Sequence, residues 1–327
     1  MSNEQLPVSN FFQSLRFRKN WIRPAIYAGI IAFIALLPVS NPSPYLLDML
    51  CTCFVSSVAA VSLRTITISG QIPLAHGAFM GIGAYAAGMA SKWLDWPGWI
   101  TIPTGALVAM GIGILISYPF SRLRSLYYAM ISLFFGIGAM LIISAGGVWT
   151  GSYQGLSGIH SLFTSKISYY YFFLVLALIC IIALYRFEFS RIGTTLKAIS
   201  QSYLVASSVG INEAFYRIMA VAVGCFFVGL IGAAYIHYQT VLNVHSYSLT
   251  ATLWLFMYVL IGGIGSFVGP IIGTFVLILI PQYFFDLKTF SPYISAALLL
   301  IVVYLMPHGI AGIPELVKSW VAKYRKE

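Results

Sequence analysis

The chain has 327 residues, of which 60% are hydrophobic and 8% charged, and its mean hydropathy is +0.90. A soluble globule of this length cannot keep so much apolar surface away from water, so the composition excludes one and predicts an integral membrane protein. The net charge of +10 would suggest a nucleic-acid partner in a soluble protein, but in a membrane protein it reflects basic residues gathered in cytoplasmic loops, so no nucleic-acid partner is expected.

Ten apolar runs are candidate membrane spans. A hydrocarbon core about 30 Å thick needs about 20 helical residues, and the runs lack the alternating pattern of an outer-membrane barrel. We predict an all-α, polytopic membrane helical bundle of about ten transmembrane helices, within a range of eight to ten. The third run is broken by Pro73, and only "GGIGS" separates the eighth from the ninth. The runs cover about residues 24–40, 45–63, 70–91, 97–118, 125–145, 169–185, 217–236, 250–265, 267–284 and 291–306.

The distribution of charge predicts the orientation of this bundle. With the N-terminus inside, only Lys92, Lys166 and Lys288 fall outside, and the remaining fifteen of the 18 basic residues fall inside. Such a bias is typical of cytoplasmic loops. We therefore expect a cytoplasmic leader over 1–23, a transmembrane domain over 24–306 and a cytoplasmic tail over 307–327, with both termini in the cytoplasm.

The longest polar interruption, "RIGTTLKAISQSYLVASSVGINEAFYR" (191–217), lies on the predicted cytoplasmic side. It predicts one amphipathic helix over about 194–211, because apolar residues recur there at spacings of three and four. Thr194 or Thr195 is expected to cap its start, and Gly210 to end it in the left-handed conformation. Asn212 and Glu213 are expected to open the seventh span. By itself the pattern fits both a helix lying on lipid headgroups and one lying on a partner protein. The residues on the apolar side are Leu196, Ile199, Tyr203 and Ala206.

Small residues recur at helical spacing and predict helices that approach closely. The four cysteines lie in apolar runs and favour packing over a disulfide or metal site. No phosphate-binding loop ending in Gly-Lys-Ser/Thr is present, so the chain is not expected to bind ATP. The small-residue sets are Gly105, Ala109 and Gly113; Cys225, Gly229 and Ala233; and Gly265, Gly269 and Gly273, and the cysteines are Cys51, Cys53, Cys180 and Cys225.

Few ionisable residues are predicted to lie in lipid. Asp48 fits an interfacial carboxylate or part of an entrance, and His76 fits a structural histidine bonded to a backbone carbonyl or a place on a translocation path. His237 and His245 are expected in a solvated outer loop. No set of acids, nucleophile and base, or metal ligands converges, so we expect no catalytic residues and no metal. This shortage favours a conduit driven by other chains over an ion-driven carrier or a hydrolase.

Several blocks between about residues 45 and 313 resemble, in order, the LivM-type permease of branched-chain amino acid ABC importers. The blocks are "GQIPLAHGAFMGIGAY" (70–85), "RLRSLYYAMISL" (122–133), "WTGSYQGLSGI" (149–159), "GTTLKAISQSYLVASSVGI" (193–211), "VLIGGIGSFVGPIIG" (259–273) and "MPHGIAG" (306–312).

The resemblance implies a permease of the type II ABC importer fold in a prokaryotic plasma (inner) membrane. It implies a LivH-like second permease, two cytosolic ATPase subunits that bind ATP and Mg, and a periplasmic or lipid-anchored binding protein. This chain itself would bind no cofactor, and its remaining contacts would be with membrane lipid. The transported class would be branched-chain, hydrophobic amino acids, moved as the two permeases rock between outward-open and inward-open states.

The resemblance also implies roles for individual residues. The amphipathic segment would be the coupling helix that docks on an ATPase, and three further positions would belong to an outer loop. The coupling residues are Leu196, Lys197, Ile199, Tyr203, Ala206 and Gly210; the pathway residues are Pro73, His76, Gly81, Tyr85, Gly262 and Gly263; the outer-loop residues are Thr150, Gly151 and Gly155.

Three departures from the family pattern affect these expectations. Pro73 and Ala75 stand where Ser and Gly are more usual, and Pro73 is expected to bend the third helix. Ser152 replaces the second glycine of the outer loop. "SQSY" (200–203) replaces a charged run, so Leu196, Ile199 and Tyr203 are expected to dock by burial.

Three other functions remain open from sequence. The same permease could carry urea, short amides or another amino acid. The chain could instead be a secondary carrier driven by an ion gradient, or a scaffold with no transport.

Overall fold

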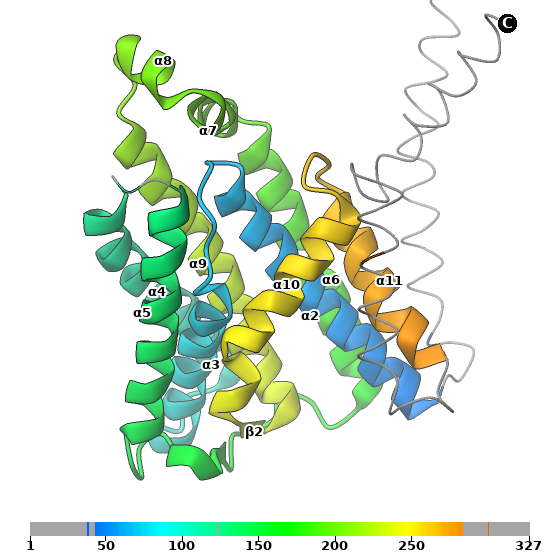
Figure 1. Ribbon diagram of the computed structural model, residues 1–327. Helices are drawn as coiled ribbons and strands as arrows, with labels where there is room; N and C mark the ends of the chain where they lie inside the picture. Colours follow the sequence, from blue (N-terminus) through cyan, green and yellow to red (C-terminus); the bar gives the residue numbers. More distant parts are fainter. Residues whose placement is uncertain (1–37, 39–42, 122, 124, 284–299, 301–327) are drawn as a thin grey trace, which may run out of the picture. The chain divides into compact units, whose positions relative to one another are not determined.

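The computed structural model describes residues 38, 43–121, 123, 125–283 and 300 (Figure 1). The chain divides into two compact units, Met1–Asp48 and Met49–Glu327, and the fold described below is that of the second. The expected leader and tail, and the predicted spans 24–40 and 291–306, lie outside the described residues.

Long helices occupy the positions of the other eight predicted spans, and the prediction of an all-α membrane bundle is confirmed. In the part of the chain that the structure describes, six segments are long and apolar enough to cross a bilayer. α3 and α11 are helical but shorter than the runs that predicted them. The helices are α2 (Pro44–Thr67), α3 (His76–Trp93), α4 (Gly98–Phe120), α5 (Ser125–Ala145), α6 (Lys166–Glu188), α9 (Glu213–Gln239), α10 (Leu249–Gly262) and α11 (Gly269–Tyr283).

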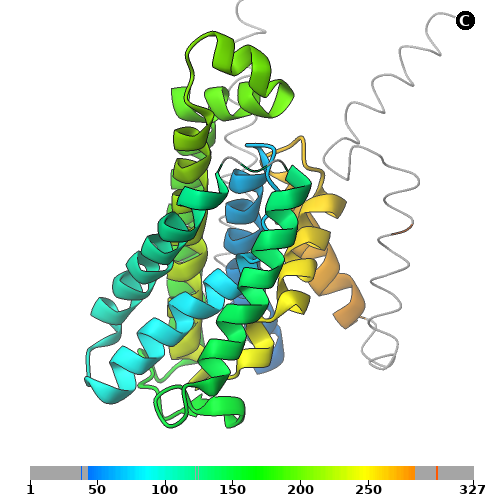
Figure 2. The ribbon, with the colours of Figure 1, turned by 60° about the vertical axis from the view of Figure 1, so that its left-hand side comes forward.

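Short elements lie at both ends of these helices. At one end, α7 (Arg191–Gln201) and α8 (Tyr203–Ser208) connect α6 to α9. At the other, β1 (Leu156–Ser157) pairs antiparallel with β2 (Val241–Leu242), and two 3-10 turns flank the strands, η2 (Ser152–Gln154) and η3 (Val244–Tyr247). We call these the α7 end and the β end; Figure 2 shows α7 and α8 across the tops of the helices.

Helices α3, α4 and α9 cross with almost no side chain between them. A Cβ added to Gly105 would lie 2.5 Å from the carbonyl oxygen of Gly83, and one added to Gly83 would lie 2.5 Å from Cα of Gly229. Gly113 faces Cys225 equally closely. The two predicted small-residue faces on α4 and α9 therefore pack against each other, as helix pairs in lipid require.

The first part of the third predicted span is not helical. α3 begins at His76 instead of residue 70, and residues 68–75 form turns and irregular backbone. Pro73 lies in this segment, so it does not bend α3; its ring and missing N–H instead keep the helix from extending toward α2. The expectation of a bend was wrong for that reason.

The segment "GGIGS" connects two separate helices. α10 ends at Gly262, Gly263 takes φ +101°, and α11 begins at Gly269 and packs back against α10. A Cβ on Gly269 would lie 2.6 Å from the carbonyl oxygens of Gly262 and Gly263. Only glycine therefore fits where α11 approaches the end of α10 in this hairpin. In contrast, a Cβ on Gly265 would meet nothing within 4 Å, so this member of the predicted set does not pack against a helix.

Candidate functional site

The amphipathic segment forms two short helices at the α7 end rather than one continuous helix. Ser202 is extended and interrupts it, and its hydroxyl accepts from the backbone N–H of Val205 to start α8. Ser190, and not Thr194 or Thr195, caps α7 by accepting from Gly193. Both threonines lie inside α7, where their hydroxyls bond the preceding turn. Gly210 is left-handed as predicted, with φ +81°, and Asn212 caps α9 as predicted.

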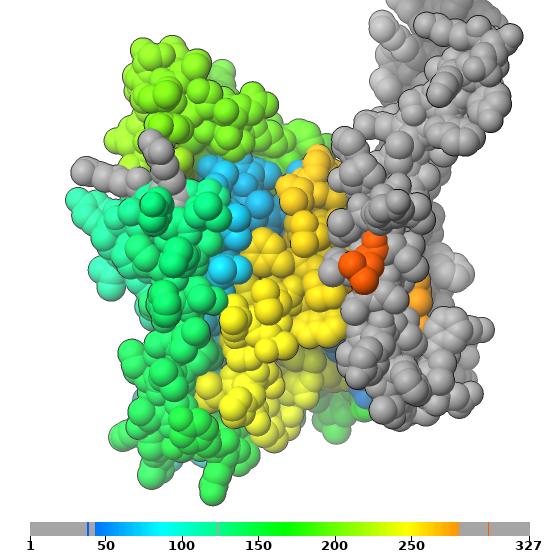
Figure 3. Space-filling view, viewed as in Figure 1, coloured from blue at the N-terminus to red at the C-terminus, as the bar shows by residue number. Residues whose placement is uncertain are grey.

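The apolar side of this segment faces its own bundle. Leu196 and Ile199 are 0% and 2% exposed, Ala206 is buried and Tyr203 is half-buried. Because Leu196 and Ile199 are already covered by this chain, the expectation that they dock on a partner was wrong. The exposed apolar side chains belong to α8 and the turn after it, namely Leu204, Val205 and Val209. Figure 3 shows α7 and α8 forming the surface at this end of the molecule.

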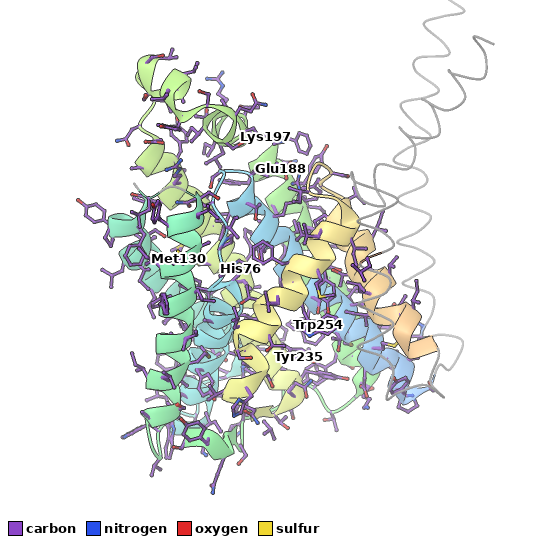
Figure 4. All side chains as sticks on the ribbon, viewed as in Figure 1. His76, Met130, Glu188, Lys197, Tyr235 and Trp254 are labelled. Carbon is purple, nitrogen blue, oxygen red and sulfur yellow. The ribbon has the colours of Figure 1, made fainter. Side chains whose placement is uncertain are left out.

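A network of charged side chains ties α7 to the bundle (Figure 4). Glu188, the last residue of α6, is 1% exposed; it pairs with Arg64 from α2 and with Lys197 from α7, whose Nζ lies 2.9 Å from Glu188 Oε1. Arg64 is 2% exposed, and its Nε donates to the carbonyl oxygen of Ile264 at 3.0 Å. The network therefore joins α2, α6, α7 and the connection between α10 and α11.

Aromatic rings and a glycine complete the surroundings of this network. The Arg64 guanidinium lies 6.0 Å from the centroid of the Phe267 ring, and Lys197 Nζ lies 4.9 Å from that of Phe189. Gly193 lies directly against the backbone of Glu188, where a Cβ would not fit. α7 is thus held close to the end of α6 by backbone as well as by charge.

Sequence reasoning missed the pair of Arg64 and Glu188. Arg64 was counted as a cytoplasmic loop cation, although it lies inside α2 and is buried. A signal was available: "YRFEFS" places Glu188 as a lone acid at the end of an apolar run that is followed by Arg191 and Lys197. A carboxylate leaving lipid among cations is expected to be paired.

The connection between α2 and α3 passes beneath α7. A Cβ added to Gly70, whose φ is +81°, would lie 3.4 Å from Cα of Ser200. Gln71 follows, 1% exposed, and among the described residues neither its side-chain oxygen nor its nitrogen has a hydrogen-bond partner. The backbone N–H of Leu74 donates to Ser132 Oγ of α5 at 3.1 Å. Irregular backbone at this depth is tolerated where protein buries it or where it lines a passage.

α3 begins inside the bundle. The Gly77 N–H donates to Thr252 Oγ1 of α10 at 2.9 Å. At about 1.5 Å per residue, Ser132 lies about 10 Å from the α7 end of α5, and Thr252 about 15 Å from that end of α10. The residue before α3, Ala75, provides no side-chain cap, and Figure 4 shows His76 within the bundle.

His76 is fully buried at this helix start. Its Nε2 lies 2.9 Å from Ser62 Oγ of α2, and none of the described residues bonds its Nδ1. Pro73 and His76, which sequence reasoning assigned to a pathway, therefore belong to one polar region where α2, α3, α5 and α10 meet. Its role in transport is taken up below as a proposal.

The other proposed pathway residues lie in two places. A Cβ on Gly81 would lie 2.7 Å from Cβ of Tyr247, so η3 packs against the middle of α3, and Tyr85 is buried one turn further along. Gly262 and Gly263 are instead in the turn between α10 and α11. Gly262 and Gly263 thus directly precede Ile264, whose carbonyl oxygen accepts a hydrogen bond from Arg64. Gly81 and Tyr85 lie deeper in the bundle.

The outer-loop residues form a compact cover at the β end. Gly151 and Gly155 have φ of +76° and +86°, and a Cβ on Gly155 would lie 2.5 Å from the carbonyl oxygen of Leu242. Leu156 and Leu242 are paired and fully buried. Thr150 is also buried, next to Gly146, and none of the described residues bonds its hydroxyl.

His237 is structural, contrary to the expectation of a solvated loop residue. It is fully buried in the last turn of α9. Its Nε2 lies 2.7 Å from Thr101 Oγ1, and its Nδ1 lies 2.7 Å from the carbonyl oxygen of His160. The Tyr169 hydroxyl donates to the His237 carbonyl and accepts from the N–H of Leu162. These bonds fix the connection before α6. In the part of the chain that the structure describes, no three His, Cys, Asp or Glu residues could hold a metal ion together.

Comparison with known proteins agrees with this architecture. A family model described as "Branched-chain amino acid transport system / permease component" matches residues 45–307. The chain is 22% identical to the high-affinity branched-chain amino acid transport system permease protein LivM of Escherichia coli, covering 92% of this chain and 82% of that protein. It is 27% identical to the corresponding protein LivH of Salmonella typhimurium, covering 77% and 89%.

A third relative is the autoinducer 2 import system permease protein LsrD of Klebsiella pneumoniae, which is 29% identical over 46% of each chain. No solved structure matches the chain significantly. The helical bundle and these matches together define a multi-pass membrane permease, a transport component and not an enzyme. The chain belongs to the family of branched-chain amino acid transport system permease components, because the match spans most of its length.

Proposed function

We propose that this chain is one of two permease subunits of an ATP-driven importer for branched-chain, hydrophobic amino acids. The second subunit is a LivH-like permease, two cytosolic ATPase subunits bind ATP and Mg, and a binding protein delivers the cargo outside. The family match over 45–307 carries the proposal, because LivM and LivH are both named as permease proteins of branched-chain amino acid transport systems.

The α7 end is proposed to face the cytoplasm and to receive the ATPase. Among the described residues, Arg64, Arg186, Arg191, Lys197 and Arg217 lie toward this end, and Lys92 and Lys166 toward the β end, a bias typical of cytoplasmic loops. The docking contacts are proposed to be the exposed Leu204, Val205 and Val209 with the half-buried Tyr203. Apolar side chains on a short helix are suited to a groove of a partner protein.

The pathway is proposed to pass the start of α3. A helix N-terminus inside a bundle directs the positive end of its dipole toward a carboxylate, as in transporters built from broken helices. His76 and Gln71 supply further polar atoms without protein partners among the described residues.

Uptake of radiolabelled leucine into vesicles tests this function. Vesicles that contain the chain with its genomically neighbouring permease, ATPases and binding protein are expected to accumulate leucine only with ATP. Accumulation driven by an ion gradient without ATP would establish a secondary carrier instead. Val205→Asp is expected to abolish uptake while leaving the bundle folded, and Phe215→Asp, at an exposed position in the first turn of α9 at the same end, reports the general cost of a new charge there.

The relative named for autoinducer 2 import gives a specific reason to test other cargo. The same vesicles should therefore be offered isoleucine, valine, urea, a short amide and autoinducer 2. ATP-dependent uptake of one of the last three, without competition by leucine, would keep the ATP-driven permease and replace the amino acid as its cargo.

A further inference from the structure

The charged network at the α7 end joins segments that come from four places in the chain. Arg64 and Glu188 are 124 residues apart and both almost fully buried, whereas Lys197 is partly exposed on α7. Glu188 uses one carboxylate oxygen for each cation, Oε2 for Arg64 and Oε1 for Lys197. A displacement of Lys197 therefore acts on the same carboxylate that holds Arg64.

Arg64 links Glu188 to two connections between helices, α2–α3 and α10–α11. It lies in the last turn of α2, directly before the irregular residues 68–75 that lead to the buried start of α3. Its Nε also holds the Ile264 carbonyl oxygen, in the connection from α10 to α11. The first connection leads directly to His76 on the proposed pathway, and the second contains Gly263, which the family resemblance also assigns to a pathway.

We propose that Glu188 is a positioning residue that transmits movement of α7 to the α2–α3 and α10–α11 connections and keeps them together at the α7 end. This inference rests on the proposed function, because it assigns α7 the movement that an ATPase would cause. In the described structure Glu188 contacts both Lys197 and Arg64, and Arg64 holds the carbonyl oxygen of Ile264 beside the end of α2. When α7 moves, Glu188 loses Lys197 and its Oε1 becomes open to water, which loosens the hold of the carboxylate on Arg64 without breaking that pair.

A buried carboxylate between two cations is better suited than apolar packing to transmit the movement of α7 to the two connections. Charge-assisted contacts are strong while the geometry is kept, and they weaken sharply once a partner leaves, which favours two discrete arrangements over a gradual change. The partial exposure of Lys197 lets water replace its contact, whereas Arg64 has no such access. α7 is therefore the side from which the network can be opened.

Thiol labelling measures the opening directly. Ser69→Cys introduces a fully buried thiol in the α2–α3 connection, in a chain whose four buried native cysteines are replaced by alanine. In membrane vesicles Glu188→Gln is expected to raise the rate at which a water-soluble maleimide labels this thiol by about threefold or more. Glu188→Asp should give an intermediate rate, because the charge remains and only its reach is shortened.

Glu213→Gln is the matched control. Glu213 lies at the same end, but its ion-pair partner Arg217 is four residues away on the same helix, so the labelling rate should stay at the parent value. If Glu188→Gln does not accumulate in the membrane, Lys197→Met replaces it, because that change leaves Arg64 and Glu188 paired. A labelling rate for Glu188→Gln, or for Lys197→Met in its place, equal to that of the parent overturns the proposal.

The complete transporter provides a second readout that a merely structural role would not change. Glu188→Gln is expected to lower leucine uptake per ATP hydrolysed by about threefold or more while ATP hydrolysis continues. Equal loss of uptake and hydrolysis would contradict transmission through Glu188. If the parent shows no ATP-dependent uptake at all, the proposed function fails, and the labelling result still decides whether Glu188 holds the two connections together.

Discussion

The two ends of the bundle are fixed by different chemistry. At the β end, neutral hydrogen bonds from Tyr169 and His237, two short strands and left-handed glycines hold the connections. At the α7 end, glycine contacts at Gly193 and Gly269 are joined by a carboxylate and two cations on separate segments. Backbone pairing and glycine contacts allow few alternative arrangements, whereas ion pairs with one partly exposed member can be exchanged for water. The difference indicates a fixed β end and a movable α7 end.

Removal of Arg64 should have the largest effect. Arg64→Met leaves Glu188 buried with one cation in place of two, and we expect the free energy of unfolding to fall by about 3–5 kcal/mol. Lys197→Met should cost under about 1 kcal/mol, because that lysine is partly exposed. Denaturant unfolding of the purified protein in detergent measures both. Equal losses for the two variants would show that burial does not distinguish the members of this network.

A change at the glycine crossing should have the next largest effect. Gly105→Val would place a side chain against Gly83 and Ala233, and we expect a loss of about 1–3 kcal/mol by overpacking. Gly111→Val, two turns along the same helix, is the control, because a Cβ there meets nothing within 4 Å. Thermal unfolding in detergent compares them. Matching midpoints would mean that α4 does not approach α3 and α9 as closely as the structure shows.

The smallest of the three effects is expected from Tyr169→Phe at the β end. It leaves the carbonyl oxygen of His237 and two backbone N–H groups without the phenol, at a cost of about 1–2 kcal/mol. Hydrogen exchange of residues 160–165 should speed up while α7 is unaffected. Tyr118→Phe, on an exposed side chain, should change neither. Faster exchange at α7 as well would remove the distinction between the two ends.

The sequence was sufficient for features that depend on local pattern. The apolar runs located the helices, the spacing of Gly105, Ala109 and Gly113 identified a packed face, and Gly210 and Asn212 marked where the amphipathic segment ends and α9 begins. The start of that segment was misplaced because Ser190, Thr194 and Thr195 are all competent caps, and only the position of α7 against the end of α6 selects Ser190.

Features that depend on distant residues were not recoverable. Glu188 and Arg64 are far apart in sequence, and no local pattern shows that they meet. Leu196 and Ile199 were correctly placed on one side of a helix, but the sequence does not say whether that side meets its own bundle or a partner. Pro73 was read as a kink because the run of apolar residues continues through it, whereas its ring ends the helix there and the bond from Leu74 to Ser132 of α5 holds the stretch as irregular backbone.

The location of α8 tests the central claim most directly, since an ATPase can act on this chain only if α7 and α8 are in the cytoplasm. Ser208→Cys places a thiol on an exposed position of α8 in a chain without its four native cysteines. A membrane-impermeant maleimide should label it in inside-out vesicles and not in intact cells, and addition of the ATPase partner should protect it. Labelling in intact cells would place this end outside and contradict the account.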